Sequence, residues 1–135
     1  MPRFTRASDL EKHLKKALDQ LQAETLITTQ AELGSSKVSP VDTGRLRSSW
    51  FAAEGTASSA VSPEGTDSPN TDAKGLRVDA FKTYHLTNNL PYAERVAVEG
   101  HVVQKPATWF TDFTSSRIPR IQAAAAKVVK SKFEL

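Results

Sequence analysis

The amino-acid sequence predicts a small mixed α+β domain with an N-terminal helix, short central helices, a mainly antiparallel sheet and a C-terminal helix. Two observations carry this prediction. Apolar residues recur at steps of three and four near both ends of the chain, as they do on one face of a helix. Shorter segments between these ends alternate in polarity, as strands do. The 135 residues match the size of one ordinary domain, so we assign 1–135 to a single domain.

The first predicted helix covers Ser8 to Leu33. Ser8 and Glu11 have the spacing of a capping box, in which a hydroxyl and a carboxylate bond to backbone amides of the first turn. Gly34 is the expected stop. The apolar residues that share one face of this helix are Leu10, Leu14, Ala17, Leu18 and Leu21.

A short helix and a strand are predicted next. Asp42 or Thr43 can cap a helix that runs through Ser49, because their side chains accept hydrogen bonds from N–H groups at a helix start. Leu46 lies on this helix and is four residues before Trp50, so we expect the two side chains to share a face. Trp50 to Ala53 is the start of the following strand.

The segment from Glu54 to Gly75 differs in composition from the rest of the chain. It consists almost entirely of small and polar residues, and Val61 is its only large apolar residue. Such a segment cannot bury enough apolar surface to offset the entropy lost on ordering. We therefore expect a long mobile loop or hairpin extension at 54–75, which becomes ordered only against a neighbouring molecule.

Four more elements are predicted in the second half of the chain. Leu76–Asn88 alternates as a strand, although Phe81 and Lys82 break the alternation. A short helix follows over Pro91–Val98; Pro91 suits its first position and Gly100 ends it. The third element is a strand at Thr108–Thr114, which carries Trp109, Phe110 and Phe113. The fourth is a last helix from about Ser116 to Phe133. Ser115 or Ser116 caps this helix, and Pro119 lies in its first turn.

The residue types exclude several classes of chemistry. The chain has no cysteine, which excludes disulfides, zinc–thiolate sites and thiol nucleophiles. His13, His85 and His101 each lack a second histidine or carboxylate at a metal-binding step, and we expect His13 to be solvated. No nucleophile elbow or phosphate-binding glycine motif is present. We therefore expect no enzymatic activity and no cofactor.

The charge and hydropathy of the chain allow an anionic neighbour but do not require one. The net charge is +3, and the last predicted helix has a basic side that is either a solvated face or a weak polyanion-binding surface. Arg45 and Arg47 are two residues apart on a short helix, so we expect them to diverge. The sequence has no run of about 18 apolar residues, and Met1–Leu10 lacks the apolar stretch of a signal peptide.

Two segments resemble one known family. Pro40–Ser49 reads PVDTGRLRSS, and Leu86–Val96 reads LTNNLPYAERV, followed by EGH at 99–101. These segments resemble the Pro-x-Asp-Thr-Gly-x-Leu and Asn-x-x-Pro-Tyr-Ala…Glu-x-Gly segments of tail-completion and neck proteins of long-tailed double-stranded DNA bacteriophages. The order of the segments, the chain length and the leading helix also agree with that family.

The resemblance implies a structural virion protein that forms a ring at the head–tail junction or at the top of the tail, around the DNA channel. Six copies are implied by the tail symmetry of the family, and twelve if the ring lies against the portal. The implied partners are further copies of the chain, neighbouring neck, head-completion and tail-terminator or tail-tube proteins, and nonspecifically contacted DNA, with no membrane. The chain would be made in the host cytoplasm and end in the virion.

The residues that the resemblance assigns to structural or interface roles are Asp42, Thr43, Gly44, Arg45, Leu46, Asn89, Pro91, Tyr92, Glu99, Gly100 and Trp109. Most of them also have a purely structural explanation as helix caps, stops or packed side chains. Two other classes of function stay open. One is a small nonspecific nucleic-acid-binding module that uses the basic C-terminal helix, and the other is an enzyme with lytic or nuclease activity.

Overall fold

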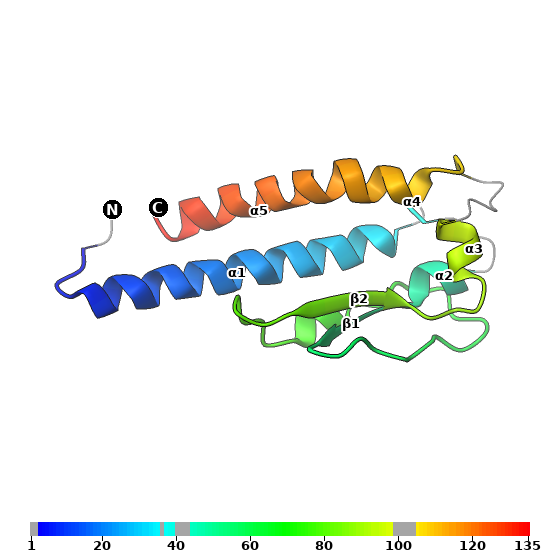
Figure 1. Cartoon of the computed structure of the whole chain (residues 1–135), viewed down its shortest axis with the longest axis horizontal. Helices are drawn as coiled ribbons and strands as arrows, with labels where there is room; N and C mark the ends of the chain where they lie inside the picture. The colour runs from blue at the N-terminus through cyan, green and yellow to red at the C-terminus, as the bar shows by residue number, and fades with distance from the viewer. Residues whose placement is uncertain (1–2, 36, 40–43, 99–104) are drawn as a thin grey trace.

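The computed structural model describes residues 3–35, 37–39, 44–98 and 105–135. It is an elongated α+β structure, as predicted, in which two long helices from the ends of the chain lie side by side (Figure 1). The first of these helices, α1 (Ala7–Leu33), is the central element, since it contacts both the C-terminal helix and the two-stranded sheet. None of the described helices is long and apolar enough to cross a membrane.

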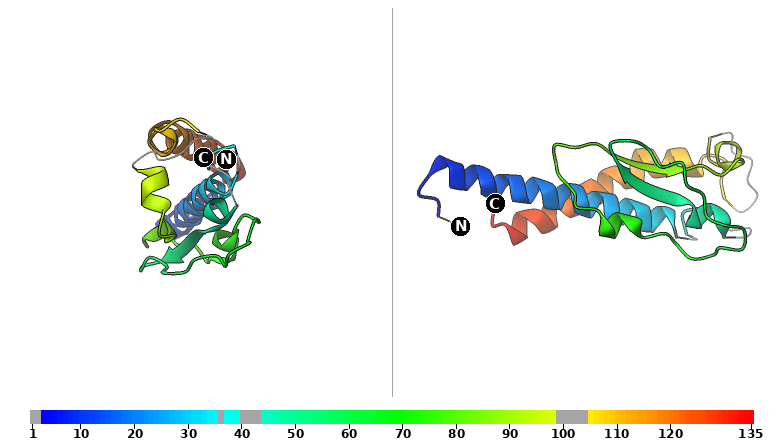
Figure 2. Two further views of the ribbon diagram at one scale, coloured as in Figure 1. Left: turned by 90° about the vertical axis from the view of Figure 1, so that its right-hand side faces the viewer. Right: turned by 90° about the horizontal axis from the view of Figure 1, so that it is seen from below.

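Helix α1 is confirmed within one residue of its predicted start, but its cap is not a capping box. The N-cap is Arg6, which makes no side-chain capping bond, and Ser8 lies inside the first turn. Of the predicted apolar stripe, Ala17 is buried, whereas Leu10, Leu14 and Leu18 keep 40–45% of their surface exposed. The sheet covers only the C-terminal half of α1, as Figure 2 shows, so the N-terminal half is covered by α5 and, near Lys15 and Asp19, by the turn at 79–82.

The C-terminal helix is longer than predicted and replaces the strand expected at Thr108–Thr114. It runs without a break for 24 residues through α4 (Trp109–Asp112), η2 (Phe113–Arg117) and α5 (Ile118–Lys132). Ser115 and Ser116 therefore lie inside the helix and do not cap it.

The segment η2 is a π-helical turn that ends two residues before Pro119. Proline has no N–H group, and in a regular α-helix its ring would clash with the carbonyl four residues earlier, here that of Ser115. A wider π-turn at this point removes the need for that hydrogen bond. The buried stripe of α5 is Ile121, Ala125 and Val129, whereas Val128 is 57% exposed.

The sheet has two antiparallel strands, β1 (Trp50–Glu54) and β2 (Tyr84–Asn88), with Trp50 opposite Asn88 and Glu54 opposite Tyr84. Strand β1 agrees with the prediction. Only the last five residues of the predicted strand Leu76–Asn88 pair with it, because residues 76–83 are irregular and include a turn at 79–82 that contacts α1.

The short helices lie at one end of the molecule (Figure 1). Helix α2 (Arg45–Ser48) has Gly44 as its N-cap, and the predicted caps Asp42 and Thr43 lie outside the described residues. Helix α3 (Ala93–Ala97) begins two residues later than predicted. Its N-cap is Tyr92, so Pro91 precedes the helix instead of opening it; the predicted stop, Gly100, also lies outside the described residues.

The long connection between the strands contains one element that the sequence does not predict, the 3-10 turn η1 (Asp72–Gly75). Ala73 in this turn is 1% exposed and packs with Leu26 and Ala52, while Val61 is 41% exposed. Mobility of 54–75 in the free chain stays a prediction. The main core lies at the α2–α3 end and combines buried residues from both long helices, the short helices and β1: Leu33, Leu46, Trp50, Leu90, Ala93, Ala97, Trp109, Phe113 and Ile121.

Candidate functional site

The two motif segments are forty residues apart in the sequence but adjacent in space. The Asn88 side-chain N–H donates to the carbonyl of Leu46 at 2.8 Å. Leu46, Leu90 and Ala93 are buried in one apolar cluster with Trp109, whose indole Nε1 donates to the Val96 carbonyl at 2.9 Å. The segments 44–49 and 88–98 together with α4 therefore form one end of the molecule, which we call the motif end.

Gly44 is required by its backbone conformation and by a close neighbour. Its φ of +81° lies in the left-handed region that side chains rarely adopt. A Cβ atom placed on Gly44 would come within 1.8 Å of the Asp67 carboxylate. The glycine of the Asp-Thr-Gly segment thus allows the 54–75 segment to approach α2 closely.

Arg45 and Arg47 do diverge, and each binds a different part of the 54–75 segment. Arg47 Nη2 donates to the Asp67 carboxylate at 2.7 Å and to the Asp67 carbonyl, and its Nη1 donates to the Gly34 carbonyl. Arg45 Nε donates to the carbonyl of Ser62 at 2.9 Å. The two arginines therefore fix the backbone of this segment at two places.

The second motif holds an earlier part of the same segment. Asn89 Nδ2 donates to the Ser58 carbonyl at 2.6 Å and to the Ala60 carbonyl at 3.1 Å. Ser62, which is 6% exposed, donates through its hydroxyl to the Ser48 carbonyl at 2.7 Å. Side chains of both motifs thus arrange residues 58–67 across the motif end.

The remaining predicted site residues fall into two groups. Pro91 and Tyr92 are exposed at the motif end, with 37% of Tyr92 accessible, and Trp109 is 5% exposed and part of the core. Asp42, Thr43, Glu99 and Gly100 lie outside the described residues. The described members are therefore either packed into the core or exposed at the motif end.

Within the described ranges, no three histidine, aspartate or glutamate side chains are grouped so that they could hold a metal ion. His13 is not solvated, contrary to the prediction: it lies against the rings of Phe4 and Phe133, with Nε2 2.7 Å from the Phe133 carbonyl. His85 Nε2 lies 3.0 Å from the Gly55 carbonyl, and His101 is outside the described residues. Both described histidines thus contact backbone carbonyls.

The residues that sequence reasoning missed are Gln30 and Asp72. Gln30 is 1% exposed and donates to the Trp50 carbonyl at 3.0 Å and to the Asp72 carboxylate at 2.5 Å, while its amide oxygen accepts from Ala73 N–H. Asp72 also accepts from Ala52 N–H at 3.1 Å. These bonds tie α1, β1 and η1 together, and no motif or period in the sequence marks them.

A second surface feature is an apolar groove of about 290 Å³ between α1, the sheet and the C-terminal helix. We call it the α1 groove. None of its lining side chains is charged; they are Gln22, Thr25, Leu26, Thr29, Leu33, Trp50, Tyr84, Leu86, Phe110, Phe113, Thr114 and Ile118. Its chemistry suits an apolar side chain or segment.

Compared with models of protein families, with curated proteins and with solved structures, the chain matches none.

Proposed function

We propose that the protein is a structural component of a bacteriophage virion, a ring subunit at the head–tail junction or the top of the tail that joins head to tail around the DNA channel. The observation that carries the proposal is the meeting of the two motif segments at one end of the molecule. The segments that resemble neck and tail-completion proteins share a core around Leu46 and Leu90, and both hold the same long loop.

The exposed chemistry of the motif end also supports an assembly role. Exposed Pro91 and Tyr92 and the loop held by Arg45, Arg47 and Asn89 form an ordered surface, and none of its described residues belongs to a cluster of metal-ligating side chains. A ring subunit needs a heterologous interface, in which one surface of a copy contacts a different surface of the next copy. The elongated shape separates the motif end from the opposite end of the two long helices (Figure 1).

Deletion of the gene from its phage is the direct test. We expect full heads and complete tails that do not join, or unstable tails, because the subunit that connects them is missing. Electron microscopy of lysates distinguishes these products, and supplying the wild-type chain in trans should restore joined particles. Supplying Lys127→Ala, altered far from the motif end, should also restore them, whereas Tyr92→Arg should not. Normal infectious particles from the deletion strain would refute the proposal.

A second candidate function, a nonspecific nucleic-acid-binding module, is favoured by the exposed face of α5. This helix carries Arg120, Lys127, Lys130 and Lys132 and no acidic residue. All four side chains are exposed, and none makes an ion pair with any described residue. Arg120, Lys127 and Lys130 share one side of the helix, whereas Lys132 lies over the Phe133 ring in the last turn. A row of three unpaired cations attracts a polyanion by releasing its counterions.

The salt dependence of DNA binding tests this second function. If α5 binds phosphates, the triple variant Arg120→Gln, Lys127→Gln, Lys130→Gln should bind duplex DNA more weakly. Its log–log salt slope should be shallower by about 0.9 for each phosphate that the variant no longer neutralises. The matched control replaces Lys12, Lys16 and Lys74 by glutamine, which removes the same charge elsewhere. An equal reduction of the slope in the control would show that α5 has no special role.

A further inference from the structure

One edge of β2 faces away from β1 and carries unpaired backbone groups. In an antiparallel pair, residues that exchange hydrogen bonds alternate with residues whose N–H and C=O groups point away from the partner strand. Gly55 N–H donates to the Thr83 carbonyl at 2.8 Å, so the bonded positions of β2 are those two and four residues beyond Thr83. The residues that point their backbone groups to the free edge are therefore Tyr84, Leu86 and Asn88. Outside the sheet, none of these three backbones bonds to a described residue.

The outer edge of β1, in contrast, is closed by side chains. Ala52 N–H donates to the Asp72 carboxylate at 3.1 Å, and the Trp50 carbonyl accepts from Gln30 at 3.0 Å. Ala52 lies opposite Leu86, and both members of such a pair point outward. Strand edges are usually protected by caps of this kind, by proline or by charged residues. Strand β2 reads YHLTN and has no proline, lysine or acidic residue, so a further strand can add to the sheet only at β2.

The free edge of β2 lies beside the α1 groove. Tyr84 and Leu86 form one wall of the groove, α1 forms its floor, and the opposite wall comes from the C-terminal helix with Phe110, Phe113 and Ile118. The end-on view in Figure 2 shows α1 between the sheet and the C-terminal helix. A strand paired with β2 would run along the groove, and every second side chain of that strand would point into it.

The lining of the groove selects the side chains that such a strand can carry. The groove holds about 290 Å³, and none of its lining residues is charged. A buried cavity of about 150 Å³ lined by aliphatic and aromatic side chains binds benzene, so there is room for about two side chains of that size. A charged group placed there would lose its hydration without gaining an ionic partner. The groove therefore fits uncharged, apolar residues at alternate positions of an extended segment.

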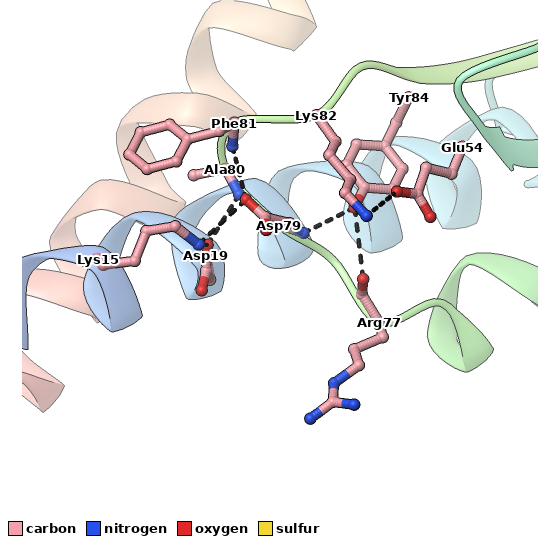
Figure 3. A network of polar contacts seen from close by, with 9 residues as sticks. All are labelled: Lys15, Asp19, Glu54, Arg77, Asp79, Ala80, Phe81, Lys82 and Tyr84. Atoms are coloured by element: carbon pink, nitrogen blue, oxygen red, sulfur yellow. Dashed lines mark hydrogen bonds and ion pairs between the residues drawn. The ribbon is translucent and has the colours of Figure 1, made fainter. Parts of the chain in front are cut away.

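The beginning of β2 is fixed by its own contacts (Figure 3). The Tyr84 hydroxyl accepts from Asp79 N–H at 2.7 Å, and Lys82 Nζ lies 2.9 Å from the Glu54 carboxylate at the end of β1. The hydrogen bond to Glu54 holds the pKa of Lys82 above its ordinary value, so Lys82 is charged at neutral pH. A strand edge that is already in place lowers the entropy cost of binding.

No described segment of the chain itself is free to supply this strand. The apolar side chains of β1 and β2 that face α1 already pack in their own core. Residues 55–71 contain one large apolar residue, Val61, and Arg45 and Asn89 hold the backbone on either side of it. In the segment 76–83, Leu76 and Val78 pack against the cluster around Leu26. These assignments leave a segment of a different protein as the occupant.

We propose that an extended segment of a different protein adds to β2 as a third, antiparallel strand and inserts apolar side chains at alternate positions into the α1 groove. Antiparallel pairing is the slightly more stable arrangement, and in it the residue opposite Leu86 exchanges two hydrogen bonds with Leu86 and points its side chain into the groove. Backbone bonds supply affinity and the groove supplies specificity, as in other cases of strand addition. The inference goes beyond the proposed function and holds whether or not the chain is a virion protein.

A synthetic peptide is the first probe. The acetylated and amidated peptide KTVTLTVTK alternates threonine with three apolar residues and has charges only at its ends. It should bind the wild-type chain in isothermal titration calorimetry. N-methylation of its valines and leucine, whose N–H groups would face β2, should weaken binding about tenfold or more, whereas N-methylation of three of its threonines should not. Equal affinities of the two methylated peptides, or no binding of the parent peptide at about 1 mM, would overturn the inference.

Amide hydrogen exchange measured by NMR locates the contact. In the free chain, the amides of His85 and Thr87 should be protected by their bonds to β1, and that of Leu86 should exchange fast. Saturation with the peptide should slow the exchange of Leu86 about tenfold or more, with His85 and Thr87 as internal references. Peptide binding without protection of Leu86 would overturn the inference. So would a Leu86 amide that is protected without peptide, because the edge would then be occupied by the same chain or by a second copy.

Two variants on the C-terminal helix test the groove. Thr114 is exposed and lines the groove, so Thr114→Trp fills part of the space and should weaken peptide binding about tenfold or more. Thr111 is exposed one turn earlier and lies outside the groove, so Thr111→Trp should bind the peptide as the wild type does. Circular dichroism checks that both variants remain folded. Equal peptide affinities of the two variants would show that the groove takes no part, which would overturn the inference.

Discussion

Replacing Gln30 by alanine is expected to lower the free energy of unfolding by about 3 kcal/mol or more. The change leaves the Trp50 carbonyl and the Ala73 N–H without the Gln30 side chain, which is 1% exposed, and removes one of the hydrogen bonds of the exposed Asp72. A buried polar group without a hydrogen bond costs about 1–3 kcal/mol. Chemical denaturation followed by circular dichroism measures the difference.

The matched control for this prediction is Gln20→Ala on the same helix. The Gln20 side chain is half-buried and makes one hydrogen bond, to Glu24 one turn away. Gln20→Ala should therefore lower the free energy of unfolding by about 0.5 kcal/mol or less. Gln30→Glu keeps the size of the side chain but places a second carboxylate beside Asp72. It should be strongly destabilised at neutral pH. A Gln30→Ala variant as stable as Gln20→Ala would show that the three bonds contribute nothing.

Gly44→Ala is expected to destabilise the motif end for two separable reasons. A non-glycine residue at a φ of +81° costs about 1–2 kcal/mol in backbone strain. The new Cβ would also displace the Asp67 carboxylate, which breaks the ion pair of Asp67 with Arg47. Thermal or chemical unfolding should therefore show a destabilisation larger than the backbone strain alone.

Gly55→Ala separates the two contributions. Gly55 has a φ of +76°, but no atom lies within 4 Å of a Cβ placed there, so this variant incurs only the backbone strain. The difference between the two variants measures the clash. The destabilisation of the double variant Gly44→Ala, Asp67→Ala should be smaller than the sum of the two single destabilisations, since Asp67→Ala removes the two carboxylate atoms nearest the new Cβ and leaves only the Cβ of residue 67 close to it. Equal destabilisation by Gly44→Ala and Gly55→Ala would contradict the close approach.

The sequence predicts the long helices well because their apolar residues repeat over many turns. It fails at Thr108–Thr114, where the positions of Trp109, Phe110 and Phe113 favour a strand. Over so short a segment, a weak alternation and a helical spacing of four are equally compatible with the residues. Packing decides between them: Trp109 and Phe113, four apart, are both buried against the α2–α3 core.

The 54–75 segment shows a second limit. Its scarcity of large apolar residues predicts little burial, and Val61 is indeed exposed. Yet Ser62, Asp67 and Asp72 are held by polar groups of α2 and α1. Such bonds depend on partners 14 to 42 residues away along the chain, and no local pattern reports them.

The candidate surfaces are predictable only in part. The resemblance singles out the motif residues, but the proximity of the two motifs appears only in the folded chain. The start of β2 leaves a signal in the sequence, since Phe81 and Lys82 break the alternation of the predicted strand 76–88 shortly before it. No pattern in the sequence predicts the α1 groove, because its lining comes from four separate parts of the chain.

The π-turn at Phe113–Arg117 changes the rotation about the helix axis between the residues that precede it and those that follow it in the C-terminal helix. Phe113 and Ile121 are eight residues apart, and a regular α-helix would rotate their side chains by about 80° relative to each other. The extra residue of the π-turn brings both to the same buried side. The number of residues at 113–117 is therefore constrained although most of them are exposed. One residue more or fewer would turn the basic face of α5 by about 100° relative to the aromatic residues of α4.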